Sequence, residues 1–235
     1  MSVAIKKLPK SRELLSRAWS AYTKNWLAFW KYILPLVLGT IVVQIMMAYE
    51  ATILVGGVLY IAIMVYALWM TVVITRISYQ TMEGKAVNEA KAKENAWNRF
   101  WPLLGVGIIT TLITFFGLMF FIVPGFILIL MYFSAQYGVI IDNQKVHEAI
   151  YKSVGLAAGR KANMFWTLLW ALLLLILVAF IIFVILSVIL GALQTTTQAD
   201  LLTTGNSIIL LIAEYLVIPW SSGVGTGMYL ALKKA

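Results

Sequence analysis

The residue of this chain whose chemistry stands out is Glu214, a carboxylate inside the apolar run of residues 207–232. A carboxylate at membrane depth is costly, so it is usually protonated, paired or turned toward a cavity. On a helix, the polar residues that follow Glu214 at spacings of seven, eight and fifteen fall on nearly the same side. The sequence therefore predicts a candidate intramembrane polar site made of Glu214, Ser221, Ser222 and Tyr229.

Glu214 has two interpretations. In the functional one, it lines a proton or substrate site of a small transporter or channel. In the structural one, it is a protonated or hydrogen-bonded residue that fixes helix packing, or its side chain extends outward to the interface. Apart from Lys31 near the start of the first predicted span, no lysine or arginine lies within a predicted span to pair with it, and a single carboxylate makes a poor transport pathway. The pattern favours the structural interpretation.

Other chemistry is sparse. The chain has no cysteine, which excludes disulfides, thiolate catalysis and Cys-ligated zinc. Its single histidine, His147, lies beside Glu148 and near Asp142 at the start of a solvated helix, a pattern typical of an ordinary surface. We find no nucleophile with a base in plausible reach. We therefore expect no enzymatic activity, no cofactor and no metal site.

Several polar or small residues at membrane depth have a packing explanation. The run SSGVGTG, residues 221–227, has small residues at i, i+4 spacing, which favours close helix packing. A phosphate-binding loop would need a lysine and a preceding strand. We expect the other polar side chains at this depth to form interhelical hydrogen bonds: Gln44, Thr110, Thr111, Thr114 and Gln136.

The composition identifies an integral membrane protein. Of 235 residues, 62% are hydrophobic and only 11% are charged, with a mean hydropathy of +0.93. So little polar surface could not cover a soluble protein of this size. The apolar runs are about 20 residues long, as transmembrane helices require, whereas barrel strands show short alternating segments. The predicted fold class is therefore all-α.

The apolar runs predict a single polytopic domain with six transmembrane helices in three hairpins. Val123, Pro124 and Gly125 form a turn signal between the third and fourth spans, because proline presets φ and glycine tolerates positive φ. The predicted spans are residues 26–48, 52–75, 102–121, 126–141, 164–193 and 207–232.

Each hairpin is preceded by a basic amphipathic segment, which predicts a helix lying in the membrane interface. The basic edges of these helices indicate binding of anionic lipid headgroups. The apolar stripes are, in chain order, Leu14, Leu15, Ala18, Trp19 and Tyr22; then Val87, Ala90, Trp97, Phe100 and Trp101; and finally Val146, Ala149, Ile150, Ser153, Val154 and Ala157.

All 18 lysines and arginines fall on one side of the six predicted spans. Under the positive-inside rule, both termini and the three amphipathic helices are cytoplasmic. Because the basic residues follow the membrane boundaries instead of gathering on a soluble face, nucleic acid is not an expected partner. The recurring unit also predicts three repeats, about residues 11–75, 86–141 and 143–232, which would pack around a pseudo-threefold axis.

The stretch from Val123 to Arg160 resembles a pattern found in bacterial and archaeal six-span membrane proteins. A Pro-Gly pair, an apolar span, an acidic residue and a helix with Ala and Ser before a glycine are present here as Pro124, Gly125, Asp142, Ala149, Ser153 and Gly159. The pattern is similar to the membrane domain of glycerophosphoryl diester phosphodiesterases and to YciC-like uncharacterised membrane proteins. The resemblance implies a prokaryotic plasma-membrane protein, and it implies no enzyme activity, because the phosphodiesterase chemistry belongs to a separate soluble domain.

These patterns predict a non-enzymatic membrane protein that organises lipids or partner proteins at the cytoplasmic leaflet. Its expected partners are anionic lipid headgroups, with a protein partner or a second copy of the chain as further options. The alternative is a small transporter or channel that uses the polar face around Glu214.

Overall fold

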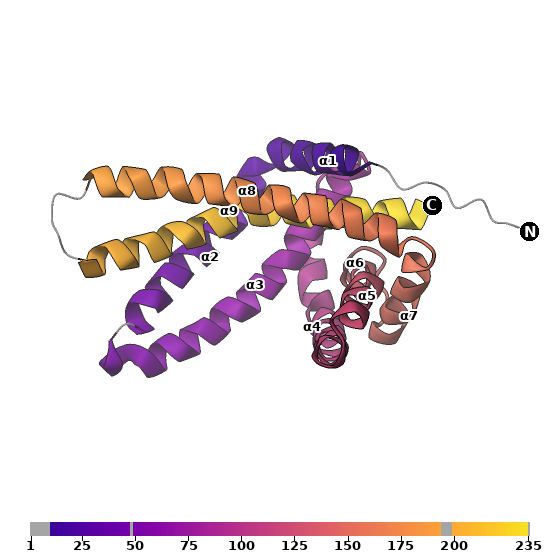
Figure 1. Cartoon of the computed structure of the whole chain (residues 1–235), viewed down its shortest axis with the longest axis horizontal. Helices are drawn as coiled ribbons and strands as arrows, with labels where there is room; N and C mark the ends of the chain where they lie inside the picture. The colour runs from indigo at the N-terminus through magenta and orange to yellow at the C-terminus, as the bar shows by residue number, and fades with distance from the viewer. Residues whose placement is uncertain (1–9, 48, 194–198, 235) are drawn as a thin grey trace, which may run out of the picture.

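The computed structural model describes residues 10–47, 49–193 and 199–234, and this part of the chain is all-helical, without a strand (Figure 1). The all-α prediction is confirmed for these residues. The helices are α1 (Ser11–Lys24), α2 (Trp26–Met47), the short 3-10 helix η1 (Glu50–Thr52), α3 (Ile53–Met82), α4 (Glu89–Phe120), α5 (Ile122–Tyr132), α6 (Ala135–Ile141), α7 (Val146–Ala157), α8 (Lys161–Leu193) and α9 (Ala199–Lys234).

Among the described residues, five helical segments are long and apolar enough to cross a bilayer, which supports a membrane-inserted protein. They overlap the first five predicted spans. The sixth predicted span, residues 207–232, lies within α9 and is not one of the five. The five segments are Trp26–Met47, Ile53–Met82, Glu89–Phe120, Ile122–Ile141 and Lys161–Val188.

The helix boundaries differ from the predicted spans. Helix α3 continues to Met82, past the predicted end of the second span at residue 75. The second amphipathic segment is not a separate element, because α4 runs without interruption from Glu89, capped by the Asn88 side chain, to Phe120. The fourth span is divided into α5 and α6 at Phe133 and Ser134. Hydropathy records how apolar a segment is, but it does not record where its backbone bends.

The predicted Pro-Gly turn is wrong in position and mechanism. The chain reverses at Phe121, which is extended (φ −152°, ψ 122°), and Pro124 lies in the first turn of α5. Gly125 is helical and does not have positive φ. A Cβ atom on Gly125 would overlap Leu118 of α4. This glycine therefore lets α4 and α5 approach closely, as small residues do between membrane helices.

Ser153 of α7 stabilises the break between α5 and α6. Its hydroxyl donates to the main-chain oxygen of Met131 (2.6 Å) and lies 2.8 Å from the hydroxyl of Ser134. Helix breaks free carbonyl groups that water cannot satisfy at membrane depth. A residue of the neighbouring helix thus supplies the missing partner.

Helix α6 is almost wholly buried in the core. It packs against α3, α4, α7 and α9, and all but one of its seven residues are buried, Gln136 being the exception. Tyr137 lies against α9 at Gly225, where a Cβ atom would overlap the tyrosine ring. Tyr137 also stacks on Tyr229, with ring centroids 6.1 Å apart. Close contact between α6 and α9 therefore depends on the glycine.

The apolar stripes of α1 and α7 are largely covered by protein. Leu14 and Ala18 of α1 are buried, and they face Gly227 and Gly223 of α9. Ala149, Ser153 and Ala157 of α7 are buried as well. Trp19 remains about half exposed. The spacing of these apolar residues predicted contact with the membrane interface, and in the structure the buried ones pack against neighbouring helices.

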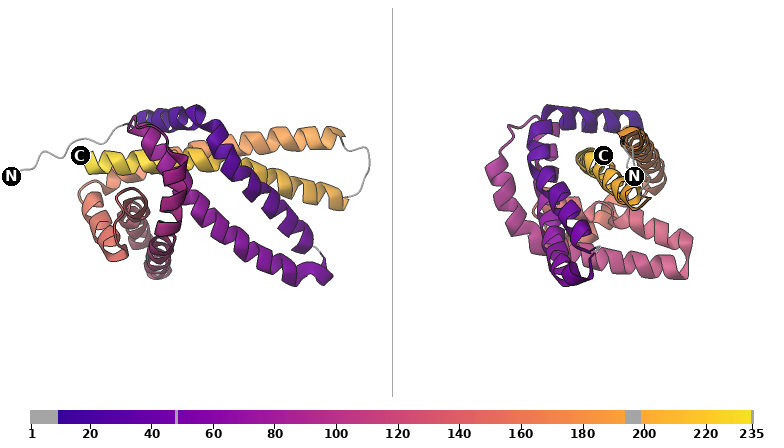
Figure 2. Two further views of the ribbon diagram at one scale, coloured as in Figure 1. Left: turned by 180° about the vertical axis from the view of Figure 1, so that it is seen from behind. Right: turned by 90° about the vertical axis from the view of Figure 1, so that its left-hand side faces the viewer.

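The hairpins do not all point in one direction. The 3-10 helix η1 between α2 and α3, the last turns of α8 and the first turns of α9 lie at one end of the molecule, and the C-terminal end of α9 lies at the other (Figure 1). The α4/α5 hairpin crosses this direction, as the right-hand view of Figure 2 shows. The three repeats and their threefold relation stay a prediction.

We predict that Gly225→Ala lowers the thermal stability of the purified protein, because the added methyl group would overlap the buried Tyr137 ring. Overpacking of this kind costs about 1–3 kcal/mol. The control is Gly57→Ala in α3, where no atom lies within 4 Å of the new Cβ and removal of a helical glycine stabilises by up to about 1 kcal/mol. Thermal unfolding in detergent checks the opposite signs, and equal shifts for the two variants would contradict the packing argument.

Candidate functional site

A cavity of about 610 Å³ opens between the α5/α6 segment and the α8/α9 hairpin, with α3 at its back. Its walls are mostly apolar. Phe126, Phe165 and Leu172 at its edge are also exposed on the outer surface of the molecule. Polar side chains from three helices line it as well: Thr71 and Thr75 of α3, Gln136 of α6, and Ser221 and Ser222 of α9.

The serines of α9 are held in place by hydrogen bonds. The hydroxyl of Ser222 lies 3.0 Å from that of Thr75 across the α3–α9 contact. Ser221, which is exposed, donates to the main-chain oxygen of Ile218 (2.8 Å). Gln136 is exposed to the same space. The cavity therefore combines mostly apolar walls with a few hydroxyl and amide groups from three helices, the usual composition of a small-molecule or lipid site.

A second cavity of about 630 Å³ lies on the other side of the α5/α6 break, and the two share Thr71, Ile129, Phe133 and Gln136. Threonines of α4 line it. Thr110 and Thr114 donate to main-chain oxygens one turn earlier in α4 (2.8 and 2.6 Å). Our prediction of interhelical hydrogen bonds is thus wrong for these two residues, since serine and threonine can satisfy themselves on their own helix.

The predicted polar face of α9 is divided by the structure. Ser221 and Ser222 line the first cavity, but Glu214 and Tyr229 are not among its lining residues. Glu214 is exposed on α9. It lies about 22 Å from Tyr229 at 1.5 Å per residue along the helix. The sequence spacing predicted that these four residues share one face of the helix, but in the structure they do not form one site.

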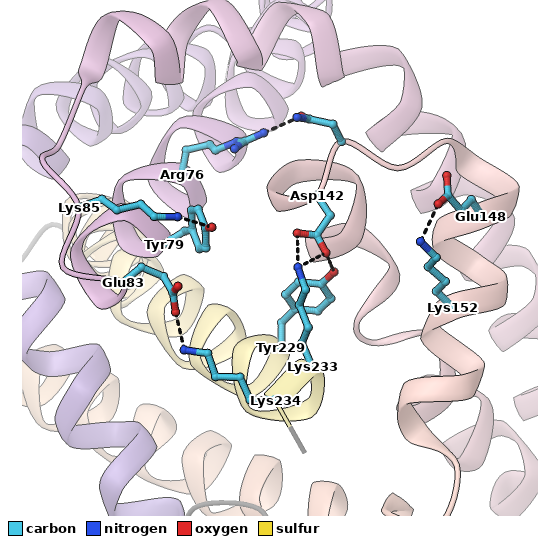
Figure 3. Close-up of polar contacts among 11 residues, drawn as sticks. Arg76, Tyr79, Glu83, Lys85, Asp142, Glu148, Lys152, Tyr229, Lys233 and Lys234 are labelled. Carbon is cyan, nitrogen blue, oxygen red and sulfur yellow. Dashed lines mark hydrogen bonds and ion pairs between the residues drawn. The ribbon is translucent and has the colours of Figure 1, made fainter.

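Tyr229 belongs instead to a polar cluster where α3, α6 and α9 end (Figure 3). Its hydroxyl donates to the Asp142 carboxylate (2.7 Å), and the Lys233 ammonium reaches both oxygens of the same carboxylate (2.8 Å). Lys234 donates to Glu83 at the end of α3 (2.7 Å). These bonds fix the C-terminal end of α9 to α6 and α3.

Two arginines converge on the loop that follows Asp142. Arg76 of α3 donates to the side-chain oxygen of Asn143 (2.6 Å), and Arg99 of α4 donates to the main-chain oxygen of Asn143 (3.1 Å). Asn143 has a φ of 57°, a conformation that asparagine tolerates. In the sequence, these arginines contributed only to the charge count, and nothing in their spacing indicated that they meet.

The residues that carry the resemblance to known membrane-protein families make packing contacts or occupy turns in the structure. Asp142 and Ser153 make the contacts described above, and Ala149 packs near Gly138 of α6. Gly159 has a φ of 71° in the turn between α7 and α8, which a residue with a side chain would adopt only under strain. Pro124 and Gly125 lie in the first turn of α5. The set therefore organises the α5–α8 region.

His147 is exposed, and Glu148 pairs with Lys152 one turn later (2.7 Å). This hydrogen bond lowers the pKa of the Glu148 carboxyl below its ordinary value. A carboxylate held ionised by a lysine on the same helix is a typical surface ion pair. Within the ranges that the structure describes, no group of three histidine or carboxylate residues is placed to hold a metal ion.

Comparison of the chain with protein-family models, with curated proteins and with solved structures finds no match.

We predict that the Glu83–Lys234 pair contributes pH-dependent stability. The hydrogen bond from Lys234 lowers the pKa of the Glu83 carboxyl below its ordinary value of 4.5. A lowered folded-state pKa stabilises the protein above the unfolded-state pKa, and this stabilisation is lost as the pH falls through the folded-state pKa. Because Lys234 is largely exposed, Lys234→Gln should cost about 0.2–1 kcal/mol near neutral pH.

The difference in unfolding free energy between wild type and Lys234→Gln should shrink toward zero in acid, with Lys24→Gln on the exposed face of α1 as the control. Unfolding in detergent at pH 7 and near pH 3 measures both. A difference that is the same at the two pH values would contradict a role for the Glu83 charge.

Proposed function

We propose that this chain is a non-enzymatic integral membrane protein that binds and organises lipids at the cytoplasmic leaflet of a prokaryotic plasma membrane. In this proposal α9 supplies the sixth span, both termini are cytoplasmic, and α1, the start of α4 and α7 lie near the headgroups. The observation that carries it is the apolar cavity of about 610 Å³ whose lining includes a few polar groups. The positive-inside distribution of the 18 basic residues supports the orientation.

On α3 and on α9, residues that line the cavity lie about one helical turn from residues beside the polar cluster. Thr75 and Gly225 line the cavity, and one turn further along their helices Tyr79 and Tyr229 lie beside the cluster. An amphiphile with its chains in the cavity would thus have its headgroup level with lysine and arginine side chains. This order of apolar and charged surfaces matches the order of a lipid leaflet.

The relation to the phosphodiesterase membrane domains and the YciC-like proteins is part of the same proposal. Asp142, Ser153 and Gly159 each hold the α5–α8 region together, and this region forms one wall of the cavity. A protein partner, or a second copy of the chain, would bind the same cytoplasmic surface.

Leu172→Trp tests lipid binding by filling the cavity from α8. Leu172 lines the cavity and is 52% exposed, whereas its neighbour Leu173 is 48% exposed and does not line it. The two substitutions are matched in size and in exposure. We expect Leu172→Trp to reduce the lipid retained by the purified protein by about half or more, and Leu173→Trp to leave it unchanged.

Native mass spectrometry of each variant, extracted with its surrounding lipid, measures this retention. Equal retention by wild type and both variants would contradict the cavity as a lipid site. Loss in both variants would show that retained lipid is a general shell around α8.

A transporter or channel is the second candidate, and one observation favours it. The two cavities share Thr71 and Gln136, so polar groups from α4 to α9 flank the α5/α6 break at membrane depth. Broken helices with polar linings are typical of transport pathways. In this function Gln136→Leu would abolish solute flux into proteoliposomes while the protein still folds. Because Glu214 does not line the cavity, Glu214→Gln would leave solute flux unchanged. Flux that is lost in Glu214→Gln and kept in Gln136→Leu would instead place the transport pathway at Glu214.

A further inference from the structure

Arg76 and Arg99 have more hydrogen-bond donors than the described residues of the protein use. Arg76 and Arg99 each spend one terminal nitrogen on Asn143. The Nε atoms of both are buried from solvent and have no partner in the part of the chain that the structure describes. A buried donor without a partner is costly, and more so when it carries charge. The site therefore lacks an acceptor.

The missing acceptor is not a carboxylate of the described residues. Neither arginine forms an ion pair among them. The nearest acidic residue along the loop, Asp142, already accepts hydrogen bonds from Tyr229 and from Lys233. Two guanidinium groups that bond to one asparagine are held close together, and two like charges so placed repel unless an anion lies between them.

We propose that Arg76 and Arg99 bind a phosphate group, and that in the membrane this group is the phosphate of an anionic lipid headgroup. A guanidinium is a planar fork whose donors match two phosphate oxygens, and two such forks converge here from α3 and α4. Figure 3 shows Arg76 reaching across to the loop after Asp142, beside the polar cluster. The lipid source of the phosphate rests on the proposed function, but the convergence of the two arginines does not.

The position of the pair fits a lipid whose chains run toward the second cavity. Arg99 is one turn before Leu103 on α4, and Arg76 is two turns after Leu68 on α3, and both leucines line that cavity. A headgroup at the arginines would therefore lie above an apolar chamber with threonines on its wall. The bound phosphate would also join α3, α4 and the α6–α7 loop through one anion.

The test uses the full-length protein in a phosphate-free detergent and three probes. Inorganic phosphate supplies the group alone, dioctanoyl phosphatidic acid supplies it on a lipid, and dioctanoylglycerol supplies the chains without it. Titration calorimetry of wild type, Arg76→Gln and Arg99→Gln gives the dissociation constants. The control is Lys31→Gln, which removes the positive charge of an exposed lysine of α2 that is paired with Glu89.

We expect each of Arg76→Gln and Arg99→Gln to weaken phosphatidic acid binding by about tenfold or more, because each removes charge-assisted hydrogen bonds. Lys31→Gln should bind phosphatidic acid as tightly as wild type, and the arginine substitutions should leave dioctanoylglycerol binding unchanged. Arg76→Lys keeps the positive charge but loses the fork, so it should fold and still bind the phosphate more weakly. Thermal unfolding of each variant without ligand identifies any variant that is lost to misfolding.

The outcomes separate this inference from the proposed function. Arginine-dependent binding of inorganic phosphate that is as tight as binding of phosphatidic acid would support the phosphate site and overturn the lipid source. Phosphatidic acid binding that survives in all arginine variants and is lost in Leu172→Trp would overturn the phosphate site and keep the lipid function. Equal affinity of wild type, Arg76→Lys and Arg76→Gln would overturn the role assigned to Arg76.

Discussion

In the hydrocarbon core of a bilayer no water is present, so every backbone hydrogen-bonding group needs a partner within the protein. The rest of this structure depends on how that need is satisfied at one helix break. The break between α5 and α6 leaves the carbonyl of Met131 without its usual partner, and Ser153 of α7 donates to it. Because this bond comes from a helix outside the hairpin, the bend in α5/α6 and the docking of α7 stabilise one another. The chain can then turn its next seven residues into the interior as α6.

Helix α6 connects the apolar cavity with the polar cluster. Tyr137 at its first turn lines the cavity and packs on Gly225, while Asp142 at its end holds Tyr229 and Lys233. Both contacts are made with α9. A ligand that changes how α6 lies in the cavity would therefore act on the ion pairs at the end of α9, and the reverse holds equally, since coupling between two sites is reciprocal. This shared element is what makes the two features one candidate site.

The sequence predicted the coarse fold well because apolar length is a local property. It identified five apolar segments that are long enough to cross a bilayer, but it placed Arg76 and Arg99 in a loop, whereas the structure has them within α3 and α4. It did not predict the α5/α6 break, since the break is stabilised by Ser153, whose role depends on tertiary contact. It grouped Glu214 with Ser221 because both lie on one helical face, although only Ser221 faces the cavity. The Arg76–Arg99 pair joins residues 23 positions apart on two helices, and one-dimensional spacing carries no information about their meeting at Asn143.

The amphipathic segments show how one pattern can serve two environments. An apolar stripe at helical spacing is satisfied equally by acyl chains and by a neighbouring helix, since both are apolar. In α1 the stripe is covered by α9, with Leu14 and Ala18 buried, whereas Arg12, Arg17 and Lys24 stay exposed. The protein contact thus uses the apolar face and leaves the basic edge available. Any affinity of α1 for an anionic leaflet therefore comes from charge more than from insertion, which makes it sensitive to ionic strength.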